Sequence, residues 1–120
     1  MFKVTRVNDR RLDLDISGKL DSEAMAKVLD EVIAKSAGMS EGRMLYRIAD
    51  FNLPTIGAIA VELSRLPELF ATIQHFNKIA VLTDKDWVKK ISEFEGAMIP
   101  HLAIKGFSLD DQLSAEEWLK

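Results

Sequence analysis

The chain has 120 residues, a formal net charge of −3 and no cysteine. A chain of this length fits one domain over residues 1–120, with a core that needs no covalent staples. The absence of cysteine excludes a disulfide framework, a thiolate zinc site and a cysteine nucleophile. Because the chain has no basic run, a nucleic-acid-binding surface lacks its electrostatic footprint.

Membrane insertion and export are also unexpected. The longest apolar stretch, residues 56–61, is far shorter than the roughly 20 residues that span a bilayer. The first residues enter an alternating pattern at once, without the charged and apolar regions of a signal peptide. We therefore expect a cytoplasmic protein with no integral membrane segment.

The chain opens with two segments of alternating polarity. Residues 2–7 alternate as an edge strand does, and residues 11–16 place Leu12, Leu14 and Ile16 on one face. The turn-forming residues Asn8 and Asp9 lie between the two segments. This pattern predicts a β-hairpin.

A helix should follow the hairpin. Asp21 is expected to cap a helix that runs to about Lys35 and buries a stripe from Met25 to Ile33, with Gly38 as its stop. Residues 43–49 then predict a strand, and residues 50–54 a connecting loop.

Residues 55–76 have a helical period with Pro67 in the middle. Because proline removes a backbone donor and clashes with the preceding turn, we expect two helices, about 55–64 and 67–75, joined at residues 64–66.

The last part of the chain repeats the strand and helix pattern. Residues 78–83 form a continuous apolar run, which is typical of a buried parallel strand. A helix capped by Asp84 or Asp86 should run to about Met98, and residues 101–107 should form a further strand. Ser108, with Asp111 three residues on, resembles a capping box that opens a last helix to Leu119.

This order of elements predicts an α/β fold. Strands that alternate with helices imply parallel βαβ units with right-handed crossovers. We therefore expect the hairpin to lead into a mostly parallel sheet covered by helices.

Four local sequences carry a resemblance to a known family. They are Gly18-Lys19-Leu20, Ile48-Ala49-Asp50-Phe51, the run from Lys78 to Trp87, and Phe107 with Glu116-Glu117-Trp118-Leu119. With these sequences and this order of elements, the chain resembles the SpoIIAA-like family, of the STAS and CRAL-TRIO type. The resemblance covers nearly the whole chain and implies a SpoIIAA-like β-α superhelix.

The resemblance implies two uses of this fold. Relatives of the CRAL-TRIO type bind lipids in an apolar cavity between sheet and helices. STAS-type regulators dock protein partners and carry a phosphorylatable serine at the start of the helix that follows the third strand. Here that region contains no Asp-Ser-Ser-Gly, and Thr55 is the one hydroxyl at the helix start. We therefore do not assign the phosphorylation site of the STAS-type regulators to this chain.

Two candidate binding surfaces follow from the predicted topology. Ligands of open α/β sheets bind at the carboxyl ends of the strands, although the polar residues there could simply cap helices. The broken helix pair offers an apolar surface that could be core, lid or dimer interface. The candidate residues on these surfaces are Asp50, Phe51, Thr55, Ile59, Leu63, Leu66, Phe70, Thr83, Asp84 and Trp87.

No catalytic constellation stands out, so we expect no catalytic residue, metal or cofactor. His75 and His101 lack metal-ligand spacing, no serine lies in a nucleophile elbow, and Asp13 with Asp15 is typical of a solvated face. The leading hypothesis is a non-catalytic binding or regulatory module, a homodimer that holds an apolar or lipid-like small molecule or a regulatory protein. The alternatives are a small hydrolase-like enzyme that uses carboxylates at the strand ends, and a phosphoregulated STAS-type switch.

Overall fold

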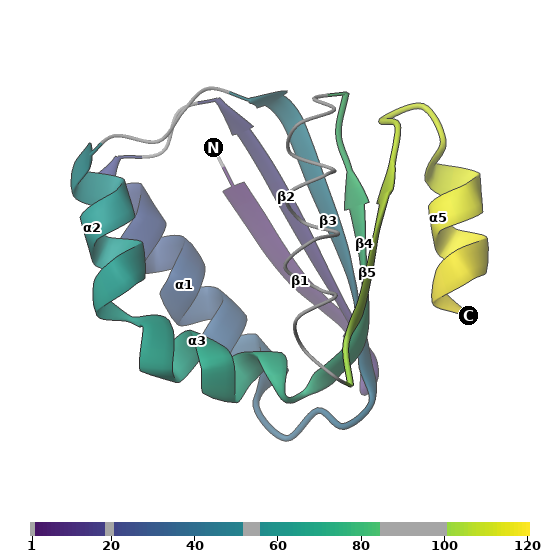
Figure 1. Cartoon of the computed structure of the whole chain (residues 1–120), viewed down its shortest axis with the longest axis horizontal. Coiled ribbons are helices and arrows are strands. Elements are labelled where there is room, and N and C mark those ends of the chain that lie inside the picture. The colour runs from purple at the N-terminus through teal and green to yellow at the C-terminus, as the bar shows by residue number, and fades with distance from the viewer. Residues whose placement is uncertain (1, 19–20, 52–55, 85–100) are drawn as a thin grey trace.

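The protein is built on a five-stranded sheet with helices on both faces (Figure 1). The structure, a computed structural model, describes residues 2–18, 21–51, 56–84 and 101–120, apart from the side chains at positions 50, 51, 59, 62 and 70. The strands lie side by side in chain order, β1-β2-β3-β4-β5. The predicted α/β fold is therefore confirmed.

The N-terminal hairpin forms as expected. Strands β1 (Phe2–Asn8) and β2 (Arg11–Gly18) are antiparallel. The side chain of Asn8 accepts a hydrogen bond from the backbone N–H of Arg10 at 2.8 Å, which holds the turn. Alternate residues of β2 are buried, namely Leu12, Leu14 and Ile16.

Helix α1 (Ser22–Ser36) also follows its local signals. The Asp21 carboxylate accepts from the backbone N–H of Ala24 at 2.8 Å, so it caps the helix as predicted. The chain leaves the helix through Gly38, whose φ of +78° favours glycine. The face of α1 that meets the sheet buries Met25, Val28, Leu29 and Val32.

The other strands extend the sheet in parallel with β2. They are β3 (Gly42–Phe51), β4 (Phe76–Leu82) and β5 (Ala103–Phe107). Strand β3 is longer than predicted, because Phe51 still pairs with Gly18 of β2. Residues 50 and 51 are thus the end of a strand, where the sequence predicted a loop.

The helical segment after β3 is broken near the predicted joint. Helix α2 (Ile56–Ser64) and helix α3 (Leu66–Ile73) meet at Arg65. Pro67 lies in the first turn of α3, where no backbone N–H is required. Both helices pack against α1 (Figure 1).

Helix α5 (Gln112–Leu119) begins later than predicted, so the expected capping box at Ser108 is wrong. Residues 108–111 form a turn in which the backbone N–H of Asp111 donates to the carbonyl of Ser108 at 3.0 Å. The Asp84 carboxylate accepts from the backbone N–H of Leu109 at 3.2 Å and helps to fix this turn. The helix predicted to end near Met98 lies outside the described residues.

Each face of the sheet carries its own core. The larger one lies between the sheet and helices α1–α3 (Figure 1). The smaller one lies under α5, where Ala115 and Leu119 pack on Leu45 and Leu82. None of the described helices is both long and apolar enough to cross a bilayer.

Candidate functional site

A cavity of about 280 Å³ lies between the sheet and helices α1 and α3. Among the described residues that line it, all but Tyr46 and Thr72 are apolar. These lining residues are Leu14, Ile16, Met25, Val28, Leu29, Val32, Met44, Tyr46, Leu69, Thr72, Ile73, Phe76, Ile79, Val81 and Ile104.

The alternation of the strands explains why this wall is apolar. Residues two apart in a strand point to the same face, so β3 contributes Met44 and Tyr46 and β4 contributes Ile79 and Val81. The opposite wall comes from the buried stripe of α1. The cavity therefore arises between two surfaces that the sequence marks as apolar.

Helix α3 closes one side of the cavity and is anchored at both ends. At its start, Arg65 forms an ion pair with Asp30 of α1. At its end, His75 Nδ1 lies 2.8 Å from the carbonyl oxygen of Met39, and the His75 carbonyl accepts from the N–H of Gly42 at 2.8 Å. These contacts fix α3 against α1 and the start of β3.

Gly42 makes the second anchor possible. A Cβ atom at this position would lie 2.6 Å from Met39 Sδ and 2.9 Å from the His75 carbonyl oxygen. Only glycine allows the two backbones to approach this closely.

The polar groups of the lining offer little chemistry. The Thr72 hydroxyl donates to the Glu68 carbonyl of its own helix at 2.9 Å. Residues 2–18, 21–51, 56–84 and 101–120 contain no group of three or more histidines and carboxylates that could hold a metal ion. The cavity is therefore suited to an apolar occupant.

Leu63 and Leu66, which were predicted on the broken helix, are not among the described residues that line the cavity. They are 61% and 38% exposed, and Ile56 at the start of α2 is 88% exposed. Ile59 and Phe70 lie in α2 and α3, but their side chains are not among those described. Among the described side chains of α3, the apolar ones that line the cavity are Leu69 and Ile73, which lie four residues apart and so on the same side of the helix.

Of the residues predicted at the strand ends, the structure describes the side chains of some and not of others. Thr83 is fully buried, and Asp84 is exposed and bonded to the N–H of Leu109. Asp50 and Phe51 end β3, with side chains outside the description, and Thr55 and Trp87 lie wholly outside the described residues. A ligand site at this rim stays a prediction.

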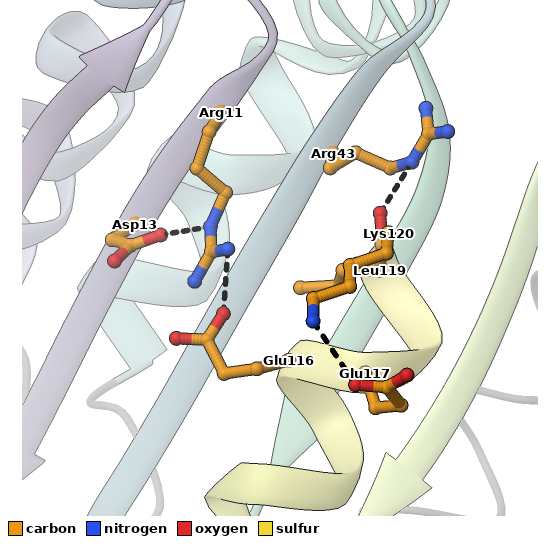
Figure 2. Close-up of polar contacts among 7 residues, drawn as sticks. All are labelled: Arg11, Asp13, Arg43, Glu116, Glu117, Leu119 and Lys120. Carbon is orange, nitrogen blue, oxygen red and sulfur yellow. Dashed lines mark hydrogen bonds and ion pairs between the residues drawn. The ribbon is translucent and has the colours of Figure 1, made fainter.

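A second group of polar residues was missed by the sequence analysis. Figure 2 shows Arg11 between Asp13 and Glu116, at 2.5 and 2.6 Å, and Arg43 donating to the carbonyl of Leu119 at 2.7 Å. Burial opposes the charge on Arg11, but its hydrogen bonds to the two carboxylates outweigh burial and raise its pKa. The hydrogen bond between Arg11 and Glu116 also lowers the pKa of Glu116.

These contacts tie α5 to the sheet. The last carbonyls of a helix have no partner within the helix, and cations near that end are favourable. Asp13 was expected on a solvated face, but through Arg11 it belongs to the contact with α5. Local sequence patterns could not predict this contact, because Arg11 and Glu116 are far apart in the chain.

Comparisons with known proteins agree with this architecture. A search of curated protein sequences found no significant match. An uncharacterised protein from Shewanella loihica with a SpoIIAA-like fold superimposes with a TM-score of 0.72 at 19% identity, covering 100% of this chain and 93% of that one. The Bacillus cell-fate determinant SpoIIAA, in its phosphorylated form, superimposes with a TM-score of 0.55 at 15% identity, covering 98% and 99%. The sequence model of the SpoIIAA-like family matches residues 11–120, and the chain belongs to that family.

Proposed function

We propose that this chain is a non-catalytic cytoplasmic binding module that holds an apolar small molecule between its sheet and helices α1 and α3. The observation that carries the proposal is the cavity of about 280 Å³ with its apolar lining. Its size is close to the lower end of small-molecule pockets, about 300 Å³. An apolar ligand of modest size matches both the volume and the chemistry.

The apolar walls of the cavity favour an apolar occupant. Removing apolar surface from water contributes about 25 cal/mol for each Å² that is buried. A ligand held between the sheet and α1 would cover Met44 and Ile79 on one wall and Val28 on the other. Its binding would therefore add to the stability of the folded protein.

Native mass spectrometry of protein purified without detergent tests the proposal directly. We expect a stoichiometric apolar adduct, and saturable binding of an uncharged fluorescent probe, N-phenyl-1-naphthylamine, to protein stripped of that adduct. Val28 lines the cavity from α1, so Val28→Phe should fill part of it and weaken both signals.

The matched control is Leu113→Phe, because Leu113 is 86% exposed on α5 and is not among the residues that line the cavity. This variant should bind the probe like the wild type. Absence of any adduct, together with equal probe binding by both variants, would show that the cavity is closed or filled by the chain itself.

A second candidate function is the docking of a protein, including a second copy of this chain. The support is the exposure of three large apolar side chains of the helix pair, Ile56, Leu63 and Leu66. Ile56 and Leu63 are seven residues apart and so lie on the same side of α2. Monomeric proteins expose few large contiguous apolar patches. Sedimentation of the wild type and of Leu63→Glu tests self-association, since a dimer built on this surface would dissociate in the variant.

The two remaining alternatives have weaker support. A hydrolase-like site needs titratable groups that face each other, whereas Asp84 is bonded to a backbone N–H at a turn. SpoIIAA of Bacillus occurs in a phosphorylated form, but a comparable switch in this chain would rest on Thr55. Incubation with a cognate kinase and mass mapping of the product would test it, because modification elsewhere contradicts that hypothesis.

A further inference from the structure

A row of three cations crosses the sheet under the end of α5. Strand pairing sets Arg11 of β2 opposite Arg43 of β3, and Arg43 opposite Lys78 of β4. Arg10 adjoins the row, because its carbonyl accepts from the backbone N–H of Arg43 at 2.7 Å. Like charges that face each other across strands destabilise a sheet, so this row needs compensating partners.

The compensation is uneven along the row. Arg11 contacts two carboxylates, Asp13 and Glu116. Lys78 donates to the carbonyls of Trp118 and Lys120, at 3.1 and 3.4 Å. Lys78 has no carboxylate side chain among its described partners, and its ammonium group also lies 5.6 Å from the centre of the Trp118 ring.

Arg43 has only neutral partners in the described part of the chain. It donates to the carbonyls of Leu119 and Glu41 and to the side-chain oxygen of Asn77, at 2.7, 2.9 and 2.9 Å. The side chain of Arg10 is exposed and makes no ion pair with any carboxylate that the structure describes. Both arginines thus lack a carboxylate side chain as a partner among the described residues.

Both arginines line a groove of about 460 Å³ between the β1–β2 turn and α5. The groove lining contains four cations and one carboxylate, and its apolar members are Val7 and Leu119. Arg11 pairs with Asp13 and Glu116, and Lys120 pairs with Glu117, so Arg10 and Arg43 are the lining cations that have no carboxylate side chain as a partner among the described residues.

We propose that this groove binds a small phosphate monoester, with the phosphate between Arg10 and Arg43 and an apolar body against Val7. A phosphate monoester carries a charge of nearly −2 at pH 7, which matches the two guanidinium groups of Arg10 and Arg43. Guanidinium also recognises phosphate oxygens through paired N–H donors. The groove volume lies within the range of small-molecule sites, about 300–1,000 Å³.

A titration that follows the arginine Nε–H signals by ¹⁵N NMR tests the proposal. Phenyl phosphate is the probe, inorganic phosphate tests the anionic part alone, and sodium chloride at equal ionic strength tests general screening. We expect saturable shifts of the Arg10 and Arg43 signals with phenyl phosphate, weaker binding of inorganic phosphate, and no saturable shift with chloride.

Single substitutions test separately the contact with the phosphate and the contact with the apolar body of the ligand. Arg10→Ala should keep the fold, since the side chain is exposed, and should weaken phenyl phosphate about tenfold, the loss expected for one charge-assisted hydrogen bond. Val7→Thr should weaken phenyl phosphate but leave inorganic phosphate unchanged.

The matched control is Arg47→Ala, which removes an arginine of β3 that faces Asp15 at 3.6 Å and lies outside the groove. It should bind like the wild type. The proposal is overturned if phenyl phosphate gives no saturable shift at millimolar concentration, if chloride gives the same shifts, or if Arg47→Ala and Arg10→Ala weaken binding equally.

Discussion

Two glycines four residues apart allow a sharp test of how the cavity wall is held. The change is Gly42→Ala, which adds a single methyl group where α3 meets β3. That methyl would lie 2.6 Å from Met39 Sδ and 2.9 Å from the carbonyl oxygen of His75. The methionine is flexible and can move aside. The His75 carbonyl is fixed, because it accepts the N–H of Gly42 itself at 2.8 Å.

The magnitude follows from this fixed contact. Replacing glycine by alanine where the backbone fits stabilises a protein by about 0.4–1 kcal/mol, but overpacking a rigid site costs about 1–3 kcal/mol. We expect overpacking to dominate, with a net loss of about 1–2 kcal/mol. For 120 residues, an unfolding entropy of about 2.1 cal/mol/K per residue converts this loss into a fall in Tm of about 4–8 °C.

The matched control is Gly38→Ala, and the assay is thermal unfolding followed by circular dichroism. Gly38 has a φ of +78° and nothing within 4 Å of an added Cβ, so it should lose about 1 kcal/mol through backbone strain alone. In the double variant with Met39→Ala, only the contact with Met39 is relieved, so Gly42→Ala should remain destabilising. An unchanged or raised Tm in Gly42→Ala would refute the reasoning.

Three further predictions concern single contacts. Asp21→Ala removes the acceptor for the N–H of Ala24 and should cost about 1 kcal/mol in urea unfolding, whereas Asp21→Asn should cost less. Leu12→Ala empties a fully buried position and should cost about 2–5 kcal/mol in the same assay, unless the core collapses around it. Because Arg11 lowers the pKa of Glu116, the ion pair stabilises the protein above the ordinary glutamate pKa and is lost as the pH falls through the lowered value. Glu116→Gln should therefore be less stable than the wild type at pH 7, by under about 1 kcal/mol since Glu116 is 38% exposed, and the gap should shrink in acid; a constant gap would contradict the assignment.

The parts of the fold that the sequence predicted depend on local signals. Alternation in residues 11–16 gave the buried face of β2, and the positions of Asp21 and Pro67 marked where helices begin. Each signal acts on residues within a few positions of itself. Such local rules need no knowledge of the rest of the chain.

The errors come from contacts between distant segments. Ser108 has the local pattern of a cap, but the nearby turn is bonded to Asp84, 25 residues from Leu109. Strand β3 continues to Phe51 because β2 offers a partner there. The cation row also depends on strand register, which places Arg11, Arg43 and Lys78 together although no local sequence is basic.

The two proposed sites can be tested separately because they lie on opposite faces of the sheet. Helices α1 and α3 cover one face of the sheet and α5 covers the other (Figure 1). The apolar cavity is lined by residues of α1 and α3, and the basic groove by residues of α5. Adjacent residues of one strand point to opposite faces, so Met44 lines the cavity while Arg43 lines the groove. Val28→Phe should therefore leave phosphate binding unchanged, and Arg10→Ala should leave the apolar adduct unchanged. Loss of both ligands in a variant whose circular dichroism spectrum and Tm match those of the wild type would contradict the assignment of two separate sites.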